Sequence, residues 1–201
     1  MNVILLGGFL GSGKTNLLLS LARFLVDQEK LRKEAVVIVE NEVGETGIDD
    51  RVLKNDGFNV RELLSGCVCC QVTGELVACI NEIAEKNNPS WVVVEASGIA
   101  LPDRILTVLI KRGNNIQLLK EIVIVDAQRW AELFDIVPQL VKPQVEKADI
   151  LLINKIDLID SRQLSAVEQS IRKLNSQALI RKVSAKSGVD QAIWQEVVAG
   201  G

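Results

Sequence analysis

Short apolar runs rich in β-branched residues recur along the chain, and stretches of helical length separate them. The runs are continuously apolar, which is typical of strands buried on both faces of a parallel sheet. Strands are expected at residues 2–6, 35–39, 91–95, 121–125, 149–153 and 178–183. Helices are expected at residues 15–28, 74–86, 102–111, 161–174 and 188–198. This alternation predicts an α/β fold with right-handed crossovers, in which helices cover both faces of one mostly parallel sheet.

Length and composition favour one globular domain over residues 1–201, because 48% of the residues are hydrophobic, 24% are charged and no linker interrupts the pattern. The net charge of −3 provides no basic field for nucleic acid or for an anionic membrane. No apolar run approaches the roughly 20 residues that span a bilayer, and the first residues do not resemble a signal peptide. We therefore expect a cytoplasmic protein that binds neither nucleic acid nor membrane.

Cysteine and histidine usage limits the available chemistry. Cytoplasmic thiols stay reduced, so closely spaced cysteines are more often metal ligands or catalytic groups than disulfides. The chain has 4 cysteines and no histidine. A transition-metal site would therefore have to use sulfur and carboxylate ligands, and acid–base chemistry would have to proceed without imidazole.

The first predicted strand leads into GFLGSGKT, residues 8–15, which matches the phosphate-binding pattern G-x-x-x-x-G-K-[ST] in every fixed position. The glycines let consecutive N–H groups face the phosphates at a helix N-terminus. Lys14 is expected to reach the β- and γ-phosphates, Thr15 to bind Mg²⁺ and Asn16 to lie at the α-phosphate. The nucleotide-binding residues predicted here are Gly8, Gly11, Ser12, Gly13, Lys14, Thr15 and Asn16. A glycine-rich turn that matches by chance is the alternative.

A second motif, NKID at residues 154–157, indicates which base is bound. The Asp157 carboxylate can accept hydrogen bonds from the ring N–H and the exocyclic amine of guanine, two donors that adenine does not offer together. Lys155 would pack along the base, and Asn154 would tie this loop to the phosphate loop. Residues 184–186, which are Ser184, Ala185 and Lys186, occupy the place of a second guanine-contacting loop. An ordinary polar turn between a strand and a helix is the alternative.

Between these motifs lies VVVEASG, in which Glu95 ends a predicted strand and Gly98 follows three residues later. Glu95 suits a water-mediated contact to Mg²⁺, and the Gly98 N–H could bind the γ-phosphate. Together with Lys14 and Thr15 they form the predicted catalytic set. A buried glutamate that caps a helix is the alternative for Glu95.

Five segments together resemble the CobW-like P-loop GTPases, a cobalamin-biosynthesis and metallochaperone family related to the nickel-insertion GTPases of urease and hydrogenase. They are residues 8–15, ENEVGE at 40–45, GCVCC at 66–70, EASGIALPD at 95–103 and NKIDL at 154–158. The resemblance implies a P-loop NTPase fold, GTP or GDP with Mg²⁺, and a transition metal, commonly zinc or cobalt. It implies the metal ligands Cys67, Cys69 and Cys70, with Glu40, Glu42 and Glu45 in a first switch segment that binds Mg²⁺ or the metal.

The resemblance also implies a client, either a metalloprotein or a protein that depends on a metal cofactor, and a homodimer. Three features depart from the family pattern. Relatives usually carry a second, C-terminal domain, which is expected to be absent because this chain stops at Gly201. They often have a histidine-rich tract, whereas this chain has no histidine, and Asn16 stands where a second threonine is usual.

The chemistry of the cysteines agrees with a metal site. Cys67, Cys69 and Cys70 can converge if the loop bends, which Gly66 permits. Three thiolates fill three of the four tetrahedral positions of zinc and leave one open, which suits delivery of the metal. Redox chemistry is less favoured because the C-x-x-C spacing is absent, and simple packing stays open. Cys79 lies on an apolar helical stripe and is expected to pack in the core.

These inferences predict a slow GTPase that couples its nucleotide state to a Cys-x-Cys-Cys metal site and delivers metal or a metal cofactor to a client. The alternative is a GTP-dependent metal sensor or assembly module without catalytic turnover. An ATP-dependent kinase is a third hypothesis, and it is disfavoured because adenine does not offer the pair of donors that Asp157 can accept.

Overall fold

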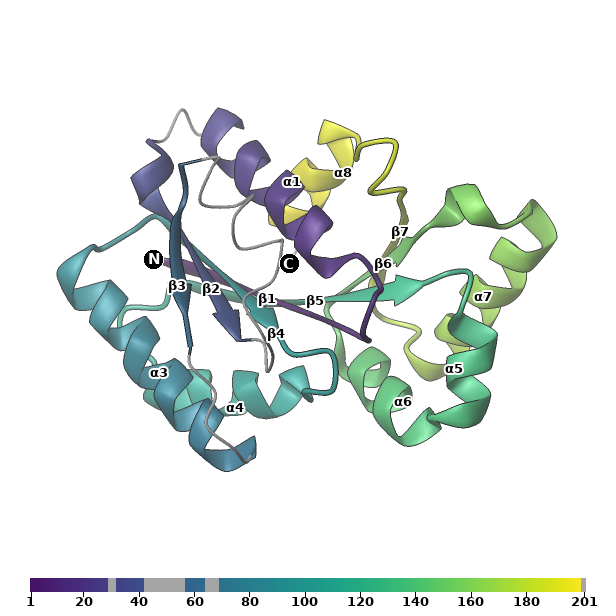
Figure 1. Cartoon of the computed structure of the whole chain (residues 1–201), viewed down its shortest axis with the longest axis horizontal. Helices are drawn as coiled ribbons and strands as arrows, with labels where there is room; N and C mark the ends of the chain where they lie inside the picture. The colour runs from purple at the N-terminus through teal and green to yellow at the C-terminus, as the bar shows by residue number, and fades with distance from the viewer. Residues whose placement is uncertain (29–31, 42–56, 64–68, 200–201) are drawn as a thin grey trace.

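The computed structural model describes residues 1–28, 32–41, 57–63 and 69–199 (Figure 1). These residues form a seven-stranded sheet in the order β3-β2-β4-β1-β5-β6-β7, and every adjacent pair of strands is parallel. The strands are β1 (Asn2–Gly8), β2 (Val36–Asn41), β3 (Asn59–Glu62), β4 (Trp91–Ala96), β5 (Leu118–Asp126), β6 (Ile150–Asn154) and β7 (Leu179–Lys182). The predicted α/β fold with a parallel sheet is confirmed.

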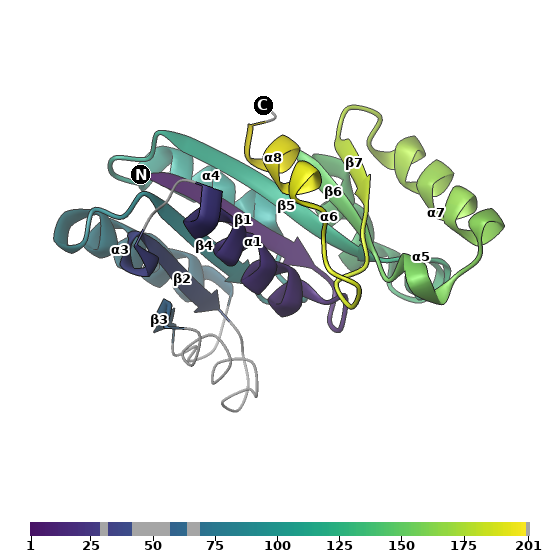
Figure 2. The ribbon, with the colours of Figure 1, turned by 90° about the horizontal axis from the view of Figure 1, so that it is seen from above.

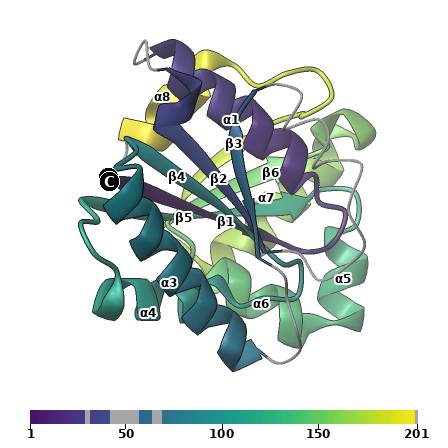
Figure 3. The ribbon, with the colours of Figure 1, turned by 60° about the vertical axis from the view of Figure 1, so that its left-hand side comes forward.

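Helices cover both faces of this sheet (Figure 3). One face carries α1 (Lys14–Gln28) and α8 (Gln191–Ala199), which lie side by side when the molecule is seen from above (Figure 2). The opposite face carries α3 (Cys69–Lys86), α4 (Pro102–Arg112), α5 (Trp130–Ile136), α6 (Pro138–Lys147) and α7 (Ser161–Leu174). Two short 3₁₀ turns, Lys33–Ala35 and Ile156–Leu158, complete the described elements.

The continuous apolar runs produce this layering because their alternate residues face opposite layers. In β4, Val93 packs with Leu17 of α1, whereas Val92 packs with Leu76 of α3. All residues of β4 and β6 are buried, as expected for central strands of a sheet covered on both sides.

Several elements differ from the sequence expectation. The strand β3 was not predicted, because it has only four residues of mixed polarity and pairs with β2 alone. The helices α5 and α6 were not predicted either, since α5 is short and α6 contains Pro143. The last helix begins at Gln191, not residue 188, because Gly188 adopts φ 90° and bridges back to Ser184.

The carboxyl ends of the strands meet at one edge of the sheet, where α/β proteins bind their ligands. There the phosphate loop follows β1, the segment with Gly98 follows β4, and the NKID segment follows β6. The described residues include no helix with the length and apolar character needed to cross a membrane.

Candidate nucleotide and metal site

The phosphate loop joins β1 to α1, and its glycines are required by geometry. Gly11 and Gly13 adopt φ 75° and 94°, conformations that side chains rarely accept. A Cβ at Gly13 would lie 2.5 Å from Asn154 Nδ2, and a Cβ at Gly8 would collide with the Ile124 carbonyl oxygen. The glycines therefore allow the tight backbone turn in which successive N–H groups can face one phosphate.

Two buried polar side chains in this loop fit a phosphate ligand. Lys14 is 5% exposed and Ser12 only 1% exposed. The Ser12 hydroxyl oxygen is buried and has no hydrogen-bond partner in the described structure. A buried hydroxyl without a partner is costly, and a phosphate oxygen in the loop would satisfy it.

Thr15 and Glu95 lie together at the position expected for Mg²⁺. The Thr15 hydroxyl donates to Glu95 Oε1 at 3.2 Å, and Glu95 is 4% exposed near the end of β4. Glu40 of β2 is in register with Glu95 across the sheet. A hydroxyl beside carboxylates is a donor set that suits Mg²⁺.

The segment with Gly98 presses against the phosphate loop. A Cβ at Gly98 would lie 2.8 Å from the Leu10 backbone nitrogen. Gln144 of α6 binds this segment through its side-chain amide. Its Nε2 donates to the carbonyl oxygens of Gly98 at 3.3 Å and Ala100 at 3.0 Å. Gln144 was not among the predicted site residues, because the sequence does not predict α6.

Asn154 joins three loops through one buried side chain. Its Nδ2 donates to the Ser12 carbonyl oxygen at 2.8 Å, and its Oδ1 accepts from the Ala185 backbone N–H at 2.9 Å. Asn154 is 1% exposed. The two predicted guanine-contacting loops and the phosphate loop thus meet at this residue.

Asp157 lies in the 3₁₀ turn after β6 and is exposed. Its Oδ1 accepts from the Ser184 hydroxyl at 2.6 Å. That hydrogen bond is the main cause of a lowered pKa of the Asp157 carboxyl, with smaller contributions that include the charge of Lys186. The carboxylate is therefore ionised at neutral pH and can accept two donors from a guanine edge.

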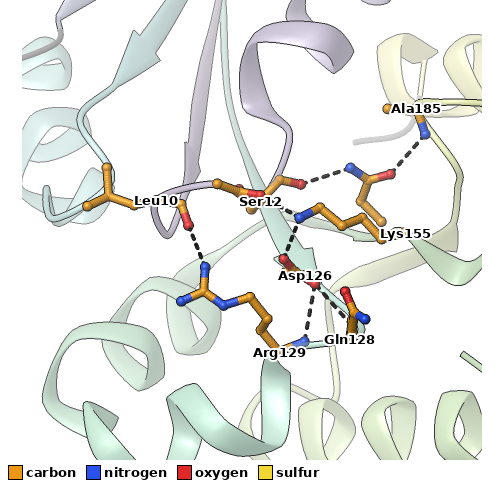
Figure 4. Close-up of polar contacts among 9 residues, drawn as sticks. Leu10, Ser12, Asp126, Gln128, Arg129, Lys155 and Ala185 are labelled. Carbon is orange, nitrogen blue, oxygen red and sulfur yellow. Dashed lines mark hydrogen bonds and ion pairs between the residues drawn. The ribbon is translucent and has the colours of Figure 1, made fainter. Parts of the chain in front are cut away.

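Lys155 connects the NKID segment to the phosphate loop (Figure 4). Its Nζ donates to the Gly11 carbonyl oxygen and to Asp126 Oδ2, both at 2.7 Å. Asp126 and Arg129, which donates to the Leu10 carbonyl oxygen at 3.3 Å, were both missed from the sequence. A carboxylate directly after the apolar run of β5 was the available signal for Asp126.

Three of the six predicted transition-metal ligands lie outside the described residues: Cys67, Glu42 and Glu45. Cys69 and Cys70 are the first two residues of α3, and only their backbone is described. In the part of the chain that is described, no three Cys, Asp or Glu side chains gather as a metal site. Cys79 packs against the core, and burial raises the pKa of its thiol, so its predicted packing role is confirmed.

A phosphate loop between a parallel strand and a helix, tied to an N-K-x-D loop, defines a P-loop nucleotide-binding protein. Residues 2–182 match the family described as CobW/HypB/UreG, nucleotide-binding domain. The chain belongs to this family, as the sequence resemblance predicted.

Individual proteins agree with this assignment. The chain is 25% identical over 223 residues to a zinc-regulated GTPase metalloprotein activator 1 of Dictyostelium discoideum, covering 91% of this chain and 46% of that protein. It is 29% identical over 215 residues to a zinc chaperone CobW of Sinorhizobium sp, covering 90% and 58%. The hydrogenase maturation factor HypB of Archaeoglobus fulgidus has a similar fold, with a TM-score of 0.67 at 18% identity, covering 100% and 89%. The chain thus spans about half the length of the two sequence relatives.

Proposed function

We propose that this chain is a GTP-binding and GTP-hydrolysing metallochaperone-like domain, which couples its nucleotide state to a metal site formed by Cys67, Cys69 and Cys70. The observation that carries the nucleotide part is the Asn154 bridge between the phosphate loop and both guanine-contacting loops. The resemblance and the zinc-related names of the relatives support the metal part.

Guanine selectivity follows from the exposed Asp157 carboxylate, which Ser184 orients and keeps ionised. An adenine at the same place would leave the carboxylate facing no pair of donors. GTP is therefore expected to bind in preference to ATP.

Hydrolysis requires water to attack the γ-phosphoryl group while negative charge is stabilised. Thr15 and Glu95 would hold Mg²⁺, which supplies charge neutralisation at the β- and γ-phosphates. Lys14 adds a second positive charge, and the Gly98 N–H donates to the γ-phosphate. Gln144 keeps Gly98 against the phosphate loop, so closure on the γ-phosphate would be felt in α6.

The cargo is a thiophilic ion, with zinc favoured over cobalt by the names of the relatives. Three thiolates leave one zinc position open, so a ligand of the client can enter before the metal leaves. The client is a metalloprotein or a protein that depends on a metal cofactor, and a homodimer is the assembly that the resemblance implies.

Nucleotide binding is tested by calorimetry with GDP and ADP. The unmodified protein is expected to bind GDP far more tightly, and Asp157→Asn is expected to erode that preference. Asp135→Asn, an equal charge change on the exposed face of α5, serves as the control. Equal affinity of the unmodified protein for GDP and ADP would overturn the base assignment.

Catalysis is tested separately by multiple-turnover phosphate release with saturating GTP, Mg²⁺ and zinc. A GTPase cycles, whereas a sensor or assembly module retains its nucleotide after at most one turnover. If each protein molecule hydrolyses GTP only once even with zinc and cell extract present, the protein is a sensor or assembly module and not a cycling GTPase.

A further inference from the structure

Asp126 is a buried carboxylate at the carboxyl end of β5, between the phosphate loop and the NKID segment (Figure 4). Its side chain is 1% exposed. Its Oδ1 accepts the backbone N–H groups of Gln128 at 3.0 Å and Arg129 at 3.2 Å, and its Oδ2 accepts Lys155 Nζ at 2.7 Å. A buried charge persists only when it is compensated, and Lys155 supplies the compensating charge.

Lys155 and Arg129, which both contact Asp126, also donate hydrogen bonds to the phosphate loop. Lys155 Nζ donates to the Gly11 carbonyl oxygen at 2.7 Å, and Arg129 Nη1 donates to the Leu10 carbonyl oxygen at 3.3 Å. Two consecutive carbonyls of the loop are thus directed toward cations.

Lys155 itself needs support, because its backbone is in the left-handed region at φ 63°. For a residue with a side chain this conformation is unfavourable, and the hydrogen bonds of the Lys155 side chain offset that cost. Lys155 directly precedes the 3₁₀ turn Ile156–Leu158 that carries Asp157. The position of Lys155 therefore determines where the guanine-accepting carboxylate stands.

We propose that Asp126 is a positioning residue for guanine recognition: it fixes Lys155, and with it the turn that carries Asp157, at the place where the base is bound. The inference rests on the proposed binding of guanine nucleotides. Asp126 acts through Lys155 and does not touch the nucleotide.

Asp126→Asn tests this inference with little change in shape, since the amide oxygen can still accept the two backbone N–H groups. Calorimetry measures the affinity of the variant for GDP and for pyrophosphate, which lacks the base, and the two affinities are compared. Loss of a charge-assisted bond predicts GDP binding weakened about 10- to 100-fold and pyrophosphate binding weakened by less than about 3-fold. Asp135→Asn is the matched control and is expected to change neither affinity.

A double-mutant cycle with Lys155→Met separates positioning from a general structural role. If Asp126 acts through Lys155, the double variant binds GDP at least as tightly as Lys155→Met alone. Additive losses, an equal loss of GDP and pyrophosphate, or unchanged GDP affinity in Asp126→Asn would each overturn the inference. A lack of preference for GDP over ADP in the unmodified protein would instead refute the proposed function, so the two failures are distinguishable.

Discussion

Glu121 makes the stability of this fold depend on pH. It lies in β5, five residues before Asp126, is fully buried, and neither carboxylate oxygen has a hydrogen-bond partner in the described structure. Burial, with smaller contributions from Asp149 and Asp103, raises the pKa of Glu121 from 4.5 to about 8. The carboxyl is therefore protonated in the folded protein at pH 6, whereas in the unfolded chain it is ionised.

The sign follows from proton binding. Between pH 4.5 and about 8 the folded state holds a proton that the unfolded state lacks, so the free energy of unfolding falls as the pH rises. At about 1.36 kcal/mol per pH unit, the loss over this interval is about 3–5 kcal/mol. Glu121→Gln keeps the size and the polarity of the protonated acid but cannot ionise. The variant should match the unmodified protein near pH 5 and be more stable at pH 8.5.

Urea unfolding at pH 5 and pH 8.5, followed by circular dichroism, measures this difference. Glu132→Gln, a change in an exposed carboxylate of α5, corrects for general charge effects. The same loss of stability with pH in Glu121→Gln as in the unmodified protein would refute the reasoning, since the titrating group would then lie elsewhere.

Three further predictions concern the nucleotide site. Asn154→Ala leaves both of its loop partners unpaired at about 1–3 kcal/mol each, so calorimetry should find GDP affinity at least about 10-fold lower; retained affinity would contradict the bridging role. Gly13→Ala should abolish tight GDP binding because of its φ of 94° and its contact with Asn154. Gly74→Ala, a substitution into open space, should leave GDP binding intact, and equal effects of the two would contradict this argument. Glu95→Gln should slow single-turnover hydrolysis more than it weakens GDP binding, and normal hydrolysis would make Glu95 structural.

The sheet and the loops at its carboxyl edge could be predicted because their signals are local. Buried parallel strands are continuously apolar, and the phosphate loop needs its glycines at fixed positions. The short helices α5 and α6 could not be predicted, because Pro143 argues against a helix and tertiary packing overrides it.

The partners of the site residues were harder to predict than the site residues themselves. Gln144 and Arg129 act through contacts that join distant segments, and nothing in their local sequence marks them. Asp126 had a local signal, its place after an apolar run, but its pairing with Lys155 depends on the neighbouring order of β5 and β6. Sequence motifs therefore predicted the residues that are proposed to bind the nucleotide, and the fold was needed to identify the residues that contact them.

The most direct test of the central claim is the zinc affinity of the protein loaded with a GTP analogue and Mg²⁺, compared with the GDP form. If the nucleotide state is coupled to the metal site as proposed, zinc is expected to bind about 5- to 150-fold more tightly in the GTP form, and GTP affinity is expected to rise by the same factor when zinc is added. Cys69→Ser should lose both tight zinc binding and the coupling, while the core variant Cys79→Ala keeps them. Identical zinc affinity in the two nucleotide forms would contradict the account and leave a GTP-binding protein without nucleotide-driven metal delivery.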